Sequence, residues 1–291
     1  GSEMPYVPDG SGWNVPYKKD ITIEQLLQHS AGVYDIDNDK VPECDGMSYT
    51  QYVTRRNPNH QFTAGELVGQ AAAHRLFYFV PGDGYHYSNT GYSMLGEIIA
   101  RVYSFRAHVP KTYTDYLKEN ITGGPTPVPL AMGFPYLATD QRLPDPHVCG
   151  IIYTKSGTEV CCHVNMSAQV AEGNGYGTLR QINHYIRSLM RGQNVLKEST
   201  VSLMQHRVSK SNPSYALGCE YRKNLGYGHN GARVGNLAFM AYNPDTEVSV
   251  VVYLPLWDLS TETQSFRHCF QAMYDAAYAA LKTLGYPGRP K

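Results

Sequence analysis

Residues 21–32 read ITIEQLLQHSAG and carry a complete set of signals for one short helix. Thr22 can cap the first turn while the side chain of Gln25 reaches back to the Thr22 backbone, which is the arrangement of a capping box. Gly32 is the expected stop, because glycine readily adopts the left-handed conformation that follows a helix. The stretch therefore predicts a short capped helix followed by a turn.

Other stretches further along the chain have equally clear local signals. Residues 81–92 read PGDGYHYSNTGY, a turn cluster that leads into a helix with an apolar stripe. Residues 178–190 show a second amphipathic helical pattern. Residues 237–242 and 248–254 are strand-like, and the turn residues between them predict a hairpin.

These signals divide the chain into three parts. Residues 1–20 are expected to be an extended lead-in, residues 21–212 a mainly helical region, and residues 213–291 a set of strands with a closing helix over roughly 261–284. Residues 33–63 are polar and are expected to be irregular. The predicted fold class is α/β (α+β), with an antiparallel sheet flanked by helices beside a mainly helical region.

The composition excludes several classes of function. The 291 residues are enough for a substantial hydrophobic core. Lys plus Arg and Asp plus Glu both number 25, and a chain without net charge or a basic run is a poor candidate for nucleic-acid binding. No stretch approaches the roughly 18 apolar residues of a membrane helix. We also expect no cofactor.

In their order, these stretches resemble serine hydrolases of the β-lactamase and penicillin-binding protein superfamily, which includes class C β-lactamases, D-alanyl-D-alanine peptidases and esterases. Residues 21–32 resemble the family's ITIRHLLTHTSG, and residues 81–92 its PG…YSNxGY element. Residues 178–199 resemble its late helix, and residues 228–246 its GHxG…YxPDTG end. Their order and spacing over about residues 20–283 make the resemblance specific.

The resemblance implies that two of the family's three catalytic motifs are present. Tyr87 and Asn89 match Tyr-x-Asn, and His229 with Gly231 matches Lys/His-x-Gly. Tyr87 would shuttle protons, and Asn89 would hydrogen-bond the motif lysine and the substrate amide. His229 would donate to a substrate carboxylate or carbonyl. Without the family context, Tyr87 is one of 24 tyrosines, Asn89 a helix cap and His229 a surface histidine. His29 is expected to be structural.

The strand after His229 offers further candidates. Gly231 would let the substrate backbone lie against the strand. By resemblance, the backbone amide of Ala232 is the second oxyanion donor. Arg233 could meet a carboxylate, or strand alternation could turn it away. Asn230 is expected to face the other side and to be structural.

The family's first motif, Ser-x-x-Lys, has no counterpart in this sequence. No serine is followed three residues later by a lysine, so the chain offers no candidate nucleophile. In the family this motif lies upstream of the stretch that residues 21–32 match, and we expect that it has been cut off rather than mutated. The full-length protein would then carry out serine hydrolase-type acyl transfer, as a peptidase, β-lactamase or esterase, while this chain alone is inactive. The alternative is a non-catalytic homologue that binds a ligand or partner in the same cleft.

The missing segment has expected consequences for the fold. In the family it contributes two strands and the nucleophile helix, so we expect about three strands here, with an open edge. Apolar residues such as Leu95, Ile98 and Ile99 would lack partners. The chain would pair with a separate N-terminal fragment or with itself. Without the motif lysine, Tyr87 is expected to titrate near about 10.

The expected ligand is a small-molecule or peptide substrate that carries an acyl group. The resemblance favours a periplasmic or secreted protein.

The six cysteines leave the redox state open. Cys149 lies before a probable hairpin, and cross-strand geometry could place it opposite Cys161 or Cys162. The resulting disulfide would favour an oxidising compartment, and buried free thiols are the alternative. His163 adjoins these cysteines, but the spacing matches no common zinc motif, so we expect no metal.

Overall fold

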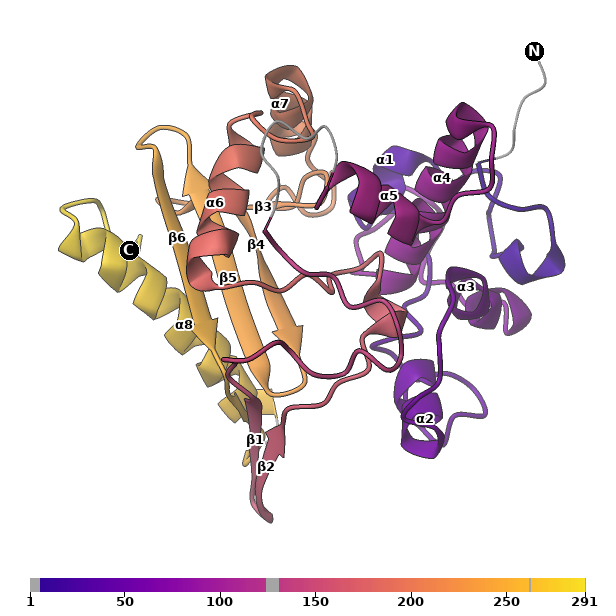
Figure 1. The fold of residues 1–291 in the computed structure, drawn as a ribbon, viewed down its shortest axis with the longest axis horizontal. Helices are drawn as coiled ribbons and strands as arrows, with labels where there is room; N and C mark the ends of the chain where they lie inside the picture. Colours follow the sequence, from indigo (N-terminus) through magenta and orange to yellow (C-terminus); the bar gives the residue numbers. More distant parts are fainter. Residues whose placement is uncertain (1–5, 124–130, 262, 291) are drawn as a thin grey trace.

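The chain forms two regions that lie side by side, one helical and one built on a β-sheet (Figure 1). The computed structural model describes residues 6–123, 131–261 and 263–290. Parts of the expected lead-in, helical region and closing helix fall outside the described residues, namely 1–5, 124–130, 262 and 291.

The helical region contains a short 3-10 helix and five α-helices: η1 (Ser11–Trp13), α1 (Ile23–Leu27), α2 (Tyr49–Arg56), α3 (Ala64–Ala73), α4 (Asn89–Ala107) and α5 (Tyr113–Asn120). Side-chain caps start all five α-helices, and the capping box of Thr22 and Gln25 is formed as predicted. At Gly32 the backbone has φ +70°, and an added Cβ would lie 2.0 Å from the carbonyl oxygen of Phe79. Glycine is therefore required at this turn.

Helix α2 lies in a stretch that the sequence predicts to be irregular. Thr50 is its only fully buried residue, and an apolar face of about one turn is formed by half-buried residues that pack against the core, namely Tyr49, Tyr52 and Val53. It starts at Ser48, whose hydroxyl accepts from the backbone of Gln51, and it ends with two arginines that suit the negative end of the helix dipole. Local end signals and this short apolar face together account for the helix.

The main sheet is antiparallel and has the strand order β3 (Glu220–Arg222), β4 (Gly226–Arg233), β5 (Asn236–Asn243) and β6 (Val248–Leu254). It has four strands where about three were expected, because the short β3 adds to the edge of β4. Strand β4 contains three glycines and polar residues, so it lacks the alternation that marks a strand. On the other edge, β6 pairs only with β5 within the described part of the chain.

Two helices cover opposite faces of this sheet. On β5, Leu237, Phe239 and Ala241 pack with Met273 of α8 (Thr263–Thr283). Residues of the other parity, Met240 and Tyr242, pack with α6 (Leu179–Met190) instead. The period of two along the strand thus builds two separate cores. The predicted fold class is confirmed.

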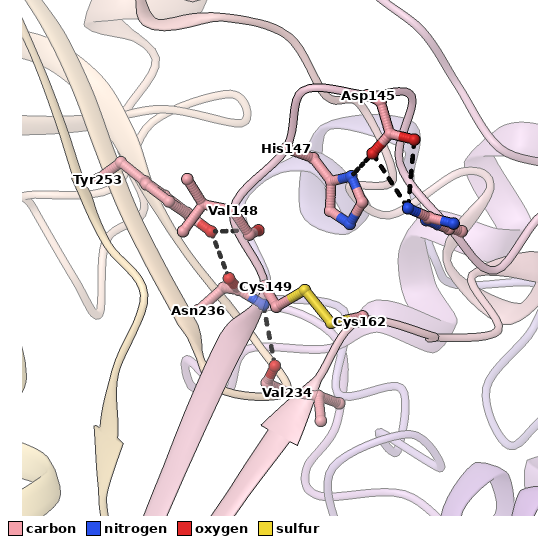
Figure 2. Close-up of a disulfide and its surroundings, with 9 residues drawn as sticks. Asp145, His147, Val148, Cys149, Cys162, Val234, Asn236 and Tyr253 are labelled. Atoms are coloured by element: carbon pink, nitrogen blue, oxygen red, sulfur yellow. Dashed lines mark hydrogen bonds and ion pairs between the residues drawn. A yellow bond between two sulfur atoms is a disulfide. The ribbon is translucent and has the colours of Figure 1, made fainter.

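A smaller three-stranded sheet contains β1 (Gly150–Thr154), β2 (Gly157–Cys161) and β7 (Trp257–Asp258). The β1–β2 hairpin forms as predicted and aligns Gly150 with Cys161. A disulfide joins Cys149 to Cys162 one residue beyond this pair (Figure 2). Cys161 is left as a buried thiol, as are Cys44, Cys219 and Cys269.

The predicted lack of partners is wrong for Leu95 and Ile98 of the α4 stripe, while Ile99 is half-buried. Leu95 and Ile98 are buried at 8% exposure each, in a core shared with α1, α3 and the loops around them. The remaining named elements are η2 (Ser167–Gln169) and α7 (Glu198–His206). Among the described residues, no helix is long and apolar enough to cross a membrane.

Candidate active site

Tyr87 and Asn89 flank the residue that starts α4. That residue is Ser88, whose hydroxyl accepts from the backbone amide of Gly91 at 3.1 Å, so the helix cap is Ser88 and not Asn89. The carboxamide of Asn89 is consequently available for another bond. It donates to Oδ2 of Asp37, 3.0 Å away.

Asp37 joins the two regions of the molecule. Its buried carboxylate accepts from Asn89, from Thr50, and from Nε2 of Gln169 at 3.1 Å. From the end of β4, Nη1 of Arg233 lies 3.7 Å from Asp37 Oδ2. Of the two orientations considered for Arg233, the structure therefore shows the one that reaches the Tyr-x-Asn side.

The surroundings of Asp37 contain more acidic than basic side chains, and burial favours the neutral form of two of the acids. Burial raises the pKa of Asp35 to about 6. Glu172 accepts from the hydroxyl of Ser93 at 2.8 Å, and burial, then Asp37 and Asp35, raise its pKa well above the ordinary value. Glu172 Oε2 and Gln169 Oε1 are buried without a hydrogen-bond partner. Nε of Arg233 is also buried without a hydrogen-bond partner among the described residues. Carboxyl groups and unpaired oxygens thus gather around one guanidinium with an unpaired donor, so the cluster suits an additional polar or charged group that can pair with them.

The phenol of Tyr87 is held in its neutral form. Its ring packs on His29 with centroids 4.0 Å apart. Burial is the largest cause that raises the pKa of Tyr87. The residue is still 37% exposed, but Tyr92, Asp35 and Glu172 also raise the pKa. The expectation of an ordinary pKa is therefore wrong. The lack of a lysine leaves Tyr87 with like-charged neighbours as well as with a desolvated ring.

His229 faces Tyr87 from β4, with ring centroids 6.1 Å apart. Its Nε2 lies 3.1 Å from the hydroxyl of Tyr215, and its Nδ1 contacts the backbone carbonyl of Asn230. Both ring nitrogens are thus engaged within the chain. The structure brings the Tyr-x-Asn and His-x-Gly motifs together at one place between the two regions.

Comparison with known proteins agrees with this arrangement. The family model Beta-lactamase matches residues 5–265. The chain belongs to the β-lactamase family.

Solved structures of the same fold include enzymes that act on amides. A D-stereospecific amidohydrolase from Streptomyces sp. has 21% identity and a TM-score of 0.69, covering 92% of this chain and 76% of its own. The D-amino acid amidase from Ochrobactrum anthropi SV3, complexed with L-phenylalanine amide, has 18% identity and a TM-score of 0.71, covering 94% and 75%. A penicillin-binding protein from Bacillus halodurans has 18% identity and a TM-score of 0.62, covering 90% and 78%. At these identities the likeness concerns the fold.

The remaining candidates on β4 of this β-lactamase family member differ in what surrounds them. Gly231 and Ala232 are exposed. A Cβ added at Gly231 would meet nothing nearer than the Cβ of Ala238 at 4.0 Å, so the strand has an open surface at this point. Asn230 donates to the hydroxyl of Tyr274 on α8 at 3.0 Å. The alternation of β4 separates the two sides as predicted for Asn230.

One group of possible metal ligands occurs in the described residues, far along the chain from both motifs. It consists of His147, Cys149 and Cys162 (Figure 2). Both sulfurs are consumed by the disulfide, and Nδ1 of His147 lies 2.9 Å from a carboxylate oxygen of Asp145. A disulfide sulfur is no thiolate, so this donor set does not fit a structural zinc site.

Proposed function

We propose that this chain supplies the Tyr-x-Asn and His-x-Gly parts of a serine hydrolase-type acyl-transfer site. The observation that carries the proposal is the approach of Tyr87 and His229 across the boundary between the two regions, with ring centroids 6.1 Å apart. Asn89 and Arg233, from the same two sides, both reach Asp37. Tyr87 and His229 are about 140 residues apart in the sequence, and two signals that served only local structure would not be expected to lie side by side.

Acyl transfer also needs a nucleophile and a group that activates it. The sequence has no Ser-x-x-Lys, and the raised pKa of Tyr87 makes its phenol a weak base as it stands. A lysine ammonium close to Tyr87 would favour the phenolate and would offset the carboxylates nearby. The unpaired Oε1 of Gln169 and Oε2 of Glu172 could accept from such a group. The complete site accordingly includes a Ser-x-x-Lys segment from outside these 291 residues, and the chain alone forms no acyl-enzyme.

The substrate we propose is a small amide or peptide. The D-stereospecific amidohydrolase and the D-amino acid amidase are named for amide substrates, and their fold is that of this chain. Exposed Gly231 leaves the surface of β4 open to an extended substrate backbone. The backbone amide of Ala232, a residue that is also exposed, would act as an oxyanion donor, as the family resemblance implies. Esters and β-lactams are the competing substrate classes for the same chemistry.

A second candidate function is ligand binding without catalysis. It is favoured by one observation, that the side chains of Asn89 and His229 are already paired within the chain, with Asp37 and with Tyr215 and Asn230. A non-catalytic homologue would keep the cleft and its internal bonds but would not need a nucleophile.

Mass spectrometry of the intact protein separates these functions. A penicillin, a nitrophenyl ester and a D-amino acid amide are each incubated with two proteins. One is the chain by itself, and the other is the chain co-expressed with the N-terminal segment that its gene encodes upstream. We expect no serine adduct on the chain alone, and an acyl adduct plus hydrolysis once a Ser-x-x-Lys segment is present. Tyr87→Phe should abolish the adduct, whereas Tyr6→Phe, at an exposed tyrosine, should not. A stoichiometric serine adduct on the chain alone contradicts the proposal, and binding without acylation by the co-expressed form favours the second function.

A further inference from the structure

A continuous set of hydrogen bonds links the two motifs through two residues that neither motif contains. The backbone amide of Ser88, between Tyr87 and Asn89, lies 3.1 Å from Nδ1 of His29. Nε2 of His29 lies 3.0 Å from the hydroxyl of Tyr215. That hydroxyl lies 3.1 Å from Nε2 of His229, whose Nδ1 contacts the carbonyl of Asn230.

The first end of this set fixes the tautomer of His29. A backbone amide can only donate, so Nδ1 of His29 must accept from Ser88. Burial lowers the pKa of His29 to about 3, with His229 and His86 adding to the effect, so the ring is neutral at physiological pH. A neutral imidazole with an accepting Nδ1 carries its hydrogen on Nε2. His29 therefore donates to the oxygen of Tyr215.

The other end fixes the tautomer of His229. A backbone carbonyl can only accept, so Nδ1 of His229 must donate to Asn230. In the neutral ring Nε2 then has no hydrogen and accepts from the hydroxyl of Tyr215. The two backbone groups at the ends thus determine the direction of every bond between them.

Among the described residues, Tyr92 competes for the Tyr215 hydroxyl, since it forms a side-chain hydrogen bond with it and itself donates to the carbonyl of Leu27 at 3.0 Å. If Tyr215 donated to Tyr92, Nε2 of a neutral His229 would have to donate to Tyr215. Its Nδ1 would then face the carbonyl of Asn230 as an acceptor against an acceptor. For neutral His229, donation from the Tyr215 hydroxyl to Nε2 of His229 is the arrangement that leaves His29, Tyr215, His229 and the Asn230 carbonyl all paired.

We propose that His29 and Tyr215 are positioning residues, which reinforce the Nδ1–H tautomer that the Asn230 carbonyl favours in neutral His229 and hold this ring in register with the Tyr-x-Asn motif. Tyr215 is 1% exposed and His29 is 2% exposed, so solvent cannot replace either bond cheaply. The link also spans the two regions, since His29 follows α1 and His229 lies on β4.

The consequence for catalysis rests on the proposed function. With Nε2 as an acceptor, His229 cannot donate from that atom to a substrate carbonyl unless it takes up a proton or breaks its bond with Tyr215. Its side chain can instead keep Tyr87 and β4 at a fixed separation, or accept a hydrogen bond from a substrate that displaces the Tyr215 hydroxyl. The tautomer thus decides which substrate atom His229 can recognise.

Nitrogen NMR of the histidine rings tests the proposal without any catalytic assay. The whole chain is labelled with 15N in its histidines, and the spectrum is recorded at a pH at which His229 is neutral. The signals of His229 are assigned by their loss in His229→Gln. We expect a protonated Nδ1 and an unprotonated Nε2 for His229, and the reverse for His29. Finding Nε2–H on neutral His229 in the parent chain overturns the proposal, whether or not any variant folds.

Tyr215→Phe then shows whether Tyr215 reinforces the tautomer. Loss of its hydrogen bond should raise the ratio of the Nε2–H to the Nδ1–H form of His229 about fivefold, with Nδ1–H still the major form because the Asn230 carbonyl remains, while His29 keeps its tautomer because Ser88 still holds it. Tyr85→Phe is the matched control, because the Tyr85 ring lies 5.8 Å from that of Tyr215 and 6.1 Å from that of His29. An unchanged His229 in Tyr215→Phe, or an equal change in both variants, overturns the positioning role. Because no acylation is measured, neither result depends on the proposed function.

Discussion

The two regions of this molecule bury different kinds of side chain. In the described residues from 213 onward, Asn243 and Ser265 are the only buried polar residues, and the core between the sheet and α8 consists of apolar side chains. The helical region instead buries many polar residues, including His29, Asp35 and Asp37.

Burying a polar group is costly unless it is hydrogen-bonded. Such groups concentrate on the side that carries the Tyr-x-Asn motif, which indicates that the helical region meets most of the cost of burying polar groups, while β4 and Tyr215 add the site residues of the other region.

The apolar side of this comparison predicts the largest loss of stability. Phe239 is 1% exposed and packs edge-on against Tyr274, with centroids 5.2 Å apart. Phe239→Ala should lower the free energy of unfolding by about 3–5 kcal/mol through lost burial and the cavity left behind. Phe105→Ala, at 63% exposure on α4, should change it by less than about 0.5 kcal/mol. Denaturant unfolding measures both, and equal effects would erase the distinction between core and surface.

The polar side predicts a pH dependence. The pKa of His29 is lowered in the folded chain from 6.5 to about 3, so its contribution to stability is complete above pH 6.5 and is lost as the pH falls toward 3, where the unfolded chain alone binds the proton. His29→Asn, which tolerates the local φ of 55°, removes this titration. Between pH 6.5 and about pH 4, the parent should lose roughly 3 kcal/mol more than the variant. Parallel curves of unfolding free energy against pH would contradict this assignment.

Loss of the disulfide should lower stability by a similar or smaller amount, and this effect is independent of both hydrophobic cores. Cys149 and Cys162 are 13 residues apart in sequence and close the β1–β2 hairpin. Cross-linking a loop of this length stabilises by about 2–3 kcal/mol. Adding a reductant should lower the melting temperature of the parent but leave the double variant Cys149→Ser/Cys162→Ser unchanged. A shift of the double variant would implicate another part of the chain.

Asp37 predicts the smallest effect. Asn89 donates to one oxygen of Asp37 and Gln169 to the other, so Asp37→Asn, which keeps a single oxygen, removes one of these acceptors and the ionic partner of Arg233. This should cost about 1–3 kcal/mol at neutral pH. Asp45→Asn is the control, because the pair of Asp45 with Arg56 is more than half exposed on both sides and should contribute less than about 1 kcal/mol. If denaturant unfolding shows that the two substitutions lower the free energy of unfolding equally, the contacts of Asp37 between the regions do not stabilise the fold.

The sequence predicted those features whose cause is local. The capping box at Thr22, the β1–β2 hairpin and the stripe of α4 depend on neighbouring residues, and all three form. Helix α2 was missed because its apolar face is short, and β3 because three residues show no periodicity. Strand β4 was expected only from the family resemblance, since its glycines break the alternation.

The same division holds at the site. The motifs identify Tyr87, Asn89 and His229, but no local pattern marks Tyr215, which meets His29 from 186 residues away in the sequence. Asp37, Gln169 and Glu172 were missed for the same reason. The pKa of Tyr87 also depends on burial and on carboxylates brought close only by folding.

The ionisation of Tyr87 tests the central claim most directly, because the account requires a site assembled by this chain yet lacking the cation that activates its tyrosine. Ultraviolet difference titration of the parent chain is compared with that of Tyr87→Phe. We expect the two curves to coincide below about pH 10, with the Tyr87 contribution appearing only above the ordinary tyrosine value. A phenolate that forms well below pH 10 in the parent and is missing in Tyr87→Phe would show that Tyr87 is already activated, and would contradict the account.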